Sequence, residues 1–158
     1  MDSSETWDKD AVAAIVAALK PAPGALMRIL RRVQDELGWV PPPALPMIAR
    51  ELNLSRAEVH GVATFYHDFR HAPPGRNVIR LCRAESCQAL GAEALADHVR
   101  ARLGVGFGET SADRAFTLEP VYCLGNCACS PAGVINGNPL GRLTPARFDD
   151  ALERLLRR

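Results

Sequence analysis

The sequence lacks the features that mark membrane, secreted or nucleic-acid-binding proteins. No apolar stretch approaches the roughly 20 residues that span a bilayer. The segment Met1–Asp10 is polar and acidic, without the basic and apolar regions of a signal peptide. The formal net charge is only +1 over 158 residues, so no overall field attracts nucleic acid or a membrane surface. These absences predict a cytoplasmic protein without a nucleic-acid or membrane partner.

Sequence motifs for catalysis and nucleotide binding are missing as well. The chain has no G-x-G-x-x-G after a predicted strand and no Walker A sequence, and no Ser/His/Asp or paired-carboxylate signature stands out. None of the four histidines (His60, His67, His71 and His98) lies within ten residues of a cysteine, which argues against a Rieske-type site. We therefore expect a chain that performs no substrate chemistry itself, with its histidines on helix faces or in packing roles.

Helical patterns fill the first seventy residues. Apolar residues recur at helical spacing, prolines and glycines separate the segments, and Ser55 with Glu58 has the spacing of a capping box. Short helices joined by proline-marked turns predict a small helical bundle. The expected helices cover Ala11–Leu19, Leu26–Leu37 with Gly38 as its C-cap, about Ala44–Leu52, and the segment after Ser55 with Val59, Val62, Ala63 and Tyr66 on its apolar face.

The character of the chain changes at His71–Gly75, a proline- and glycine-rich segment. The second half then alternates strand and helix patterns, with a hairpin turn at Asn136–Gly137. This β-α-β-β-β-α order predicts a small α/β sandwich with a mixed sheet, and domains of residues 1–74 and 75–158. The expected strands are Val78–Leu81, Phe116–Val121, Gly133–Ile135 and a return over Pro139–Leu143; the expected helices are Gly91–Leu103 and one that begins at Thr144–Pro145.

Cysteine is the residue type that points to chemistry. Four of the five cysteines form two close pairs, Cys82-x4-Cys87 and Cys123-x3-Cys127, and each pair follows a predicted strand. In a cytoplasmic chain such cysteines indicate a metal or redox site more than a disulfide framework. If the two strands are neighbours, four thiolates meet at one edge of the sheet. We expect Cys82, Cys87, Cys123 and Cys127 to be the metal ligands, and Cys129 to be a small buried residue outside the ligand set.

Four thiolates suit either zinc or an iron–sulfur cluster. Structural zinc usually uses C-x2-C knuckles, whereas both loops here are wider, as a two-iron rhomb requires. Gly125 allows the backbone to approach the sulfurs closely. A [2Fe–2S] cluster on four thiolates carries charge −2, or −3 when reduced, so Arg80 and Arg83 beside Cys82 either offset this charge or are solvated side chains.

Two segments resemble the thioredoxin-like [2Fe–2S] ferredoxin family, whose best-known member is the small peripheral-arm subunit of respiratory complex I. One is the cysteine pattern, with Cys123–Cys127 reading Cys-Leu-Gly-Asn-Cys; the other is Val59–Tyr66, which is similar to the family's Val-x-Gly-Val-Ala-Thr-Phe-Tyr element. Within the family, Phe65–Arg70 and Leu81–Gln88 look most like the gamma subunit of cytoplasmic, NAD-dependent, molybdenum-containing formate dehydrogenases.

The resemblance implies a thioredoxin-like second domain and one [2Fe–2S] cluster on the four matched cysteines. It also implies an electron-transfer role beside an FMN- and NAD-binding subunit, and through it a molybdenum- and Fe–S-containing catalytic subunit, with the N-terminal helices as a docking element. The equivalent subunit of complex I or of an NAD-reducing hydrogenase is the alternative.

Three further hypotheses stay open from the residues alone. A structural zinc module is disfavoured by the loop spacing, and a thiol–disulfide oxidoreductase by the absence of C-x-x-C. A free-standing ferredoxin is disfavoured by the long N-terminal segment, which a small Fe–S domain does not need.

Overall fold

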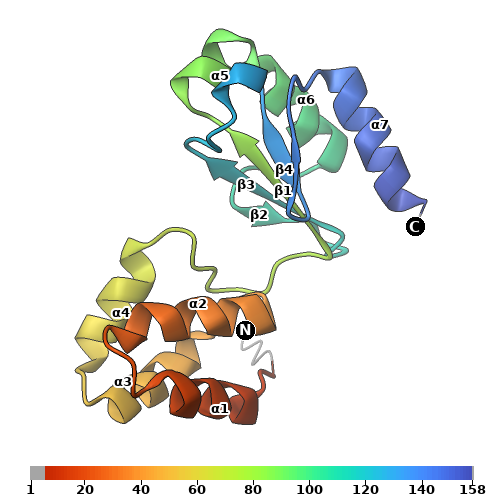
Figure 1. The fold of residues 1–158 in the computed structure, drawn as a ribbon. Helices are drawn as coiled ribbons and strands as arrows, with labels where there is room; N and C mark the ends of the chain where they lie inside the picture. The colour runs from red at the N-terminus through yellow and green to blue at the C-terminus, as the bar shows by residue number, and fades with distance from the viewer. Residues whose placement is uncertain (1–5, 158) are drawn as a thin grey trace. The chain divides into compact units, whose positions relative to one another are not determined.

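The computed structural model describes residues 6–157, and the chain divides into two compact units between Pro73 and Pro74. This division lies one residue from the boundary that the sequence suggests. The first unit is helical, as expected (Figure 1). Its elements are α1 (Lys9–Leu19), α2 (Ala25–Leu37), the 3₁₀ turn η1 (Pro42–Ala44), α3 (Leu45–Leu52) and α4 (Arg56–Phe65).

Local side-chain and backbone chemistry fixes the ends of these helices. The Asp8 carboxylate caps α1 by accepting hydrogen bonds from the N–H groups of Asp10 and Ala11, at 3.0 and 2.9 Å. Gly38 ends α2 in the left-handed region, with φ of 83°. The predicted capping box of α4 is confirmed: the Glu58 N–H donates to Ser55 Oγ at 3.1 Å, and the Ser55 N–H donates to Glu58 Oε2 at 2.8 Å.

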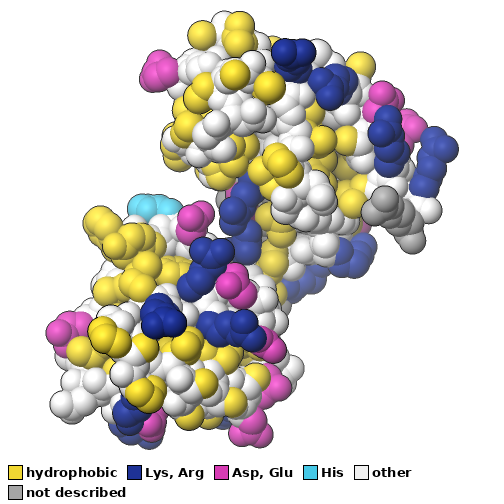
Figure 2. Space-filling model, viewed as in Figure 1, with side chains coloured by type: hydrophobic (Ala, Val, Ile, Leu, Met, Phe, Trp, Pro, Cys, Tyr) yellow, Lys and Arg dark blue, Asp and Glu magenta, His cyan; other side chains and the backbone are white. Residues whose placement is uncertain are grey.

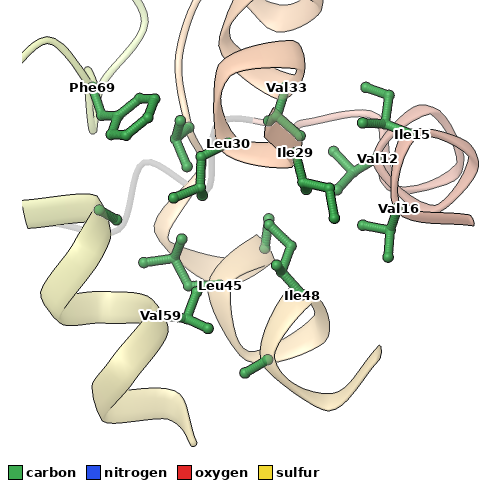
Figure 3. Close-up of a cluster of buried hydrophobic side chains, with 14 of the residues drawn as sticks. Val12, Ile15, Val16, Ile29, Leu30, Val33, Leu45, Ile48, Val59 and Phe69 are labelled. Atoms are coloured by element: carbon green, nitrogen blue, oxygen red, sulfur yellow. The ribbon is translucent and has the colours of Figure 1, made fainter. Parts of the chain in front are cut away.

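Aliphatic side chains from all four α-helices form the core of the first unit (Figure 3). Ile29 and Val33 of α2 and Ile48 of α3 are fully buried, and Leu45 and Ala49 are the other buried residues of α3. One expectation was wrong. Helix α4 ends at Phe65, so Tyr66 lies outside the helix and is exposed instead of continuing its apolar face.

A side-chain contact ties the segment after α4 to α2. The side-chain amide of Gln34 donates to the Asp68 carbonyl oxygen and its oxygen accepts from the Arg70 N–H, both at 2.7 Å. Gln34 therefore satisfies two backbone groups of a segment that belongs to neither a helix nor a strand.

The second unit is a five-stranded mixed sheet flanked by helices (Figure 1). The strand order is β2-β3-β1-β4-β5; β1 runs parallel to β3, and the other neighbouring pairs are antiparallel. The elements are β1 (Asn77–Cys82), α5 (Glu85–Ala89), α6 (Ala92–Leu103), β2 (Glu109–Thr110), β3 (Phe116–Val121), the 3₁₀ turn η2 (Cys127–Cys129), β4 (Gly133–Ile135), β5 (Asn138–Leu140) and α7 (Pro145–Leu156).

One face of this sheet packs against α6 and α7. Ile79 of β1 lies in register with Leu118 of β3, and both are fully buried together with Phe148 of α7. The two helices also contact each other through His98 and Asp149, whose Nε2 and Oδ1 atoms are 3.0 Å apart. The alternation of residues along β1 and β3 therefore places Arg80 and Glu119 on the opposite face.

The predicted turns and caps of the second unit are confirmed. Asn136 and Gly137 both have positive φ, 48° and 81°, as a two-residue hairpin turn between β4 and β5 requires. Thr144 Oγ1 accepts from the Arg147 N–H at 3.2 Å and Pro145 is the first residue of α7. The sequence did not predict α5 or β2, and the return strand is shorter than expected.

Candidate metal centre

The parallel pairing of β1 and β3 brings the start of both cysteine pairs to the same edge of the sheet. Cys82 is the last residue of β1 and lies in register with Val121, the last residue of β3. Cys123 follows two residues after Val121. Because parallel strands end at a common edge, the two loops that carry the cysteines leave the sheet side by side. The sequence predicted a shared site only if these two strands were neighbours, and they are.

The first pair is enclosed by the protein. Cys82 is 3% exposed and Cys87, on α5, is 2% exposed. They pack with Ala92 at the start of α6 and with Ala132 before β4. The Cys82 N–H donates to the Ala132 carbonyl at 3.0 Å, which fixes the end of β1 against the neighbouring chain segment.

The second pair is open to solvent. Cys123 and Cys127 are both exposed, and their sulfur atoms lie 3.9 Å apart. The Gly125 N–H donates to the Cys123 sulfur at 3.3 Å, and Gly125 has φ of 70°. A residue with a Cβ rarely adopts this backbone conformation. The glycine thus permits the close approach of the backbone to a sulfur that the sequence suggested.

The environment of the first pair distinguishes its two thiols. Burial raises the pKa of Cys82, against the opposing hydrogen bonds from the backbone N–H groups of Ala84 and Leu124. Burial also raises the pKa of Cys87. Hydrogen bonds from Ser130, Cys82 and the Ala132 N–H outweigh this effect, so the pKa of Cys87 is lowered overall. Backbone N–H groups therefore already point at the sulfurs of the buried pair.

The two pairs interact with each other. The pKa of Cys127 is raised, mainly by Cys123 and also by the charges of Cys87 and Cys82. Ser130 connects the loops physically, because its hydroxyl donates to the Cys127 carbonyl at 3.0 Å and lies 3.3 Å from the Cys87 sulfur. All four predicted ligand residues thus lie in one region.

The described part of the chain does not bring three or more His, Cys, Asp or Glu side chains together around one metal ion. The four cysteines instead gather as two pairs. On a tetrahedral metal with metal–sulfur bonds of about 2.3 Å, two thiolates lie about 3.8 Å apart, close to the 3.9 Å between Cys123 and Cys127. A two-iron cluster needs two thiolates on each iron, so the donor set and its pairing fit a [2Fe–2S] group.

The two arginines beside Cys82 have partners other than the cysteines. Arg80 Nε pairs with Glu119 Oε2 at 2.7 Å, and Arg83 pairs with Glu93 at 2.7 Å. The Arg83 guanidinium also lies over the Phe107 ring, 4.8 Å from its centroid. Each arginine therefore has a carboxylate partner, so neither is simply a solvated charge. An effect of either arginine on the charge of a cluster stays a prediction.

The remaining candidates take ordinary structural positions. Cys129 is half-buried, and its Cβ faces Gly141 so closely that a Cβ on Gly141 would lie 2.6 Å away. His98 binds Asp149, whereas His60, His67 and His71 are exposed.

Sequence reasoning missed two serines at the site. Ser86 follows the first residue of α5, and Ser130 follows Cys129; their hydroxyl oxygens lie 3.0 Å apart. The one signal in the sequence that could have identified them is their position next to the cysteines. A hydroxyl in a ligand loop often forms a hydrogen bond with a ligand residue.

A profile of the family described as "Thioredoxin-like [2Fe-2S] ferredoxin" matches residues 12–156. A subunit of the NADH-quinone oxidoreductase of Pseudomonas aeruginosa is 40% identical over 132 residues, which cover 84% of this chain and 77% of the relative. Subunit 2 of the NADH-quinone oxidoreductase of Thermus thermophilus is 39% identical, over 83% of this chain and 73% of the relative. Within residues 6–157, no helix has the length and apolar character needed to cross a membrane.

Two solved structures of an NAD+-reducing [NiFe]-hydrogenase, air-oxidised and H2-reduced, superpose with TM-scores of 0.70 and 0.72 at 29% and 30% identity. They cover 83% and 87% of this chain, which spans only 22% and 23% of the hydrogenase chains. The mixed sheet with its helices is thioredoxin-like, as expected, and a single [2Fe–2S] cluster fits this family. By the profile match and by its relatives, the chain belongs to the thioredoxin-like [2Fe–2S] ferredoxin family.

Proposed function

We propose that this chain holds one [2Fe–2S] cluster on Cys82, Cys87, Cys123 and Cys127 and transfers electrons as a subunit of an NADH-quinone oxidoreductase-type complex. The observation that carries the proposal is the meeting of two cysteine pairs at the common edge of β1 and β3. When bound, the cluster would supply one-electron redox chemistry. The chain's own residues would hold the irons, bury one side of the group and direct backbone N–H groups at the sulfurs.

The relatives indicate the type of complex to which this subunit belongs. The sequence suggested a formate dehydrogenase gamma subunit, whereas the relatives are subunits of NADH-quinone oxidoreductase and the solved structures are of an NAD+-reducing hydrogenase. They support the complex I-type alternative better. In either case we propose that the chain lies on the cytoplasmic side, in a complex whose FMN and NAD bind a larger partner subunit. A molybdenum- and Fe–S-containing subunit belongs to the proposal only if the complex oxidises formate.

We further propose that residues 1–74 dock onto the FMN- and NAD-binding subunit, while residues 75–158 hold the cluster. The aromatic residues at the end of α4 support this role. Phe65 is 72% exposed and packs edge-on against Tyr66, with ring centroids 5.2 Å apart. Figure 2 shows hydrophobic side chains gathered over this end of α4. Exposed aromatic side chains of this kind are enriched at protein interfaces.

Metal analysis of the full chain, purified without oxygen, tests the cluster. We expect two irons and two sulfides per chain, visible absorption, and an EPR signal after one-electron reduction. A colourless protein with one tightly bound zinc would overturn the proposal in favour of the structural zinc module.

Isolation of the tagged chain from its own cell tests the complex. We expect a polypeptide that binds FMN and NAD to co-purify, and the presence or absence of molybdenum separates the formate dehydrogenase from the complex I type. The variant Phe65→Ser should weaken this association, while Leu156→Ser, which changes a similarly exposed residue of α7 (60% exposed), should not. Elution of the chain alone would instead favour a free-standing ferredoxin.

A further inference from the structure

Two serine hydroxyls form a connected group beside the buried cysteine pair. Ser130 is 8% exposed, and its Oγ lies 3.3 Å from Cys87 Sγ and 3.0 Å from Ser86 Oγ. It also lies 3.0 Å from the Cys127 carbonyl oxygen, which Ser86 Oγ approaches at 3.5 Å. The two hydroxyls therefore stand between one cysteine of each pair.

When Cys87 binds a metal, the available protons determine which of these groups donates a hydrogen bond and which accepts one. A metal-bound thiolate has no proton and can only accept, whereas each serine has one proton to donate. The Ser130 O–H then has the Cys87 sulfur as a charged acceptor, and such hydrogen bonds are roughly twice as strong as neutral ones. In the structure the Ser130 O–H donates to the Cys127 carbonyl oxygen at 3.0 Å, and this single proton turns to the sulfur when Cys87 becomes a charged, metal-bound thiolate. The Ser86 O–H can then donate to Ser130 Oγ at 3.0 Å.

We propose that Ser130, oriented by Ser86, is a positioning residue that donates a hydrogen bond to the Cys87 sulfur and raises the reduction potential of the cluster. The inference rests on the proposed function, because it requires Cys87 to be a ligand. Reduction adds a negative charge to the cluster, and part of that charge lies on the sulfurs. A donor in a buried environment stabilises the reduced form more than the oxidised form, so its removal lowers the potential.

Ser130 differs from the other donors at this site in being a side chain. The N–H groups of Ala84, Leu124 and Ala132 that act on Cys82 and Cys87 belong to the backbone, and a substitution leaves them in place. The Ser130 hydroxyl can be removed alone, and threonine at the same position retains a hydroxyl. The site therefore offers a direct test of one hydrogen bond to one sulfur.

The experiment is an EPR-monitored redox titration of the full chain, with the cluster in place, for five proteins: wild type, Ser130→Ala, Ser130→Thr, Ser86→Ala and Ser111→Ala. We expect Ser130→Ala to lower the equilibrium constant for reduction roughly three- to tenfold, which is about 30 to 60 mV for a one-electron couple. Ser86→Ala should lower it by less, and Ser130→Thr should lie near the wild type.

Ser111→Ala is the matched control, because it removes a hydroxyl of the same unit that binds Asp113 at 2.6 Å and no cysteine. Its potential should equal that of the wild type. A deuterium coupling after exchange into D2O, seen by pulsed EPR, should also weaken in Ser130→Ala. This signal reports an exchangeable proton next to the cluster, which a change in stability alone would not remove.

The possible failures are separable. If the wild-type chain binds no [2Fe–2S] cluster, the proposed function is wrong. If the cluster forms and Ser130→Ala leaves both the potential and the deuterium coupling unchanged, only the role of Ser130 is overturned. If Ser130→Ala does not retain the cluster, the reduction potential of the Ser86→Ala protein is the test. A potential below that of the wild type supports the inference, and a potential equal to that of the wild type overturns it.

Discussion

The sulfur atoms of Cys123 and Cys127 lie 3.9 Å apart on the open side of the site, while Cys82 and Cys87 are buried behind them. We expect alanine at any of these four positions to abolish the visible absorption of the cluster. Metal binding is coupled to folding, so each variant should also lose stability in the second unit, measured by chemical denaturation under anaerobic conditions.

Cys129→Ala is the control for these variants. Cys129 is next to the ligand loop, and its Cβ faces Gly141. Its absorption and EPR spectra should match those of the wild type. Loss of the spectrum in this variant would show that the ligand set is assigned wrongly.

The cross-strand ion pair between Arg80 and Glu119 predicts a stability effect without a cluster effect. Both side chains are partly buried, and Nε and Oε2 are 2.7 Å apart. Arg80→Ala removes this charged hydrogen bond and should lower the free energy of unfolding of the second unit by about 1 to 2 kcal/mol. Arg157→Ala, in an exposed pair with Glu153, should change it by less than about 0.5 kcal/mol.

The reduction potential of the double variant Arg80→Ala/Glu119→Ala should stay within error of the wild type, because it removes two opposite charges that balance each other. A marked fall in potential would instead support a direct electrostatic role of Arg80 at the cluster.

Two glycine-to-alanine variants should change stability in opposite directions. A Cβ on Gly133 of β4 would lie 2.9 Å from the Arg80 carbonyl oxygen of β1, so Gly133→Ala must push the strands apart. We expect a loss of about 1 to 3 kcal/mol in the second unit. Gly61 lies inside α4, and a Cβ added to it would have no neighbouring atom within 4 Å. Gly61→Ala should therefore stabilise the first unit by about 0.5 to 1 kcal/mol, as thermal unfolding can show.

The capping box of α4 predicts a pH dependence. Hydrogen bonds from the backbone and side chain of Ser55 lower the pKa of Glu58 below its usual 4.5. A lowered folded-state pKa means that the carboxylate stabilises the helix fully above the unfolded pKa, and that this stabilisation is lost as the pH falls through the folded pKa. Glu58→Gln keeps an acceptor oxygen but does not titrate. The difference in Tm between wild type and Glu58→Gln should shrink on acidification from about pH 6 to about pH 3, and a constant difference would contradict the assignment.

Much of the fold follows from local signals in the sequence. Gly38 caps the end of α2, Ser55 caps the start of α4, and Asn136–Gly137 forms the turn of the last hairpin, because few other residue types suit these positions. The strands β1 and β3 were predictable for another reason, because each is a short run of residues with high strand propensity beside turn signals. By contrast, α5 has only five residues and β2 only two, which is too short for a periodic pattern to emerge.

The candidate site was partly predictable. The paired spacing of the four cysteines and their positions after two strands were sufficient to predict that they gather at one edge, given parallel neighbours. The partners of Arg80 and Arg83 were not, because Glu119 and Glu93 are distant in sequence and reach them only through strand register and the placement of α6. The contacts of Ser130 and Gln34 likewise depend on loop conformations that no periodicity encodes.

The unequal burial of the two cysteine pairs has a consequence for the route that electrons take. Protein shields the side of Cys82 and Cys87, whereas Cys123 and Cys127 face the solvent. Electron tunnelling weakens steeply with distance, so a redox partner would approach a group in this frame across the open rim and not through the shielding behind it. In the assembled complex, the neighbouring redox groups would therefore lie on the side of Cys123 and Cys127.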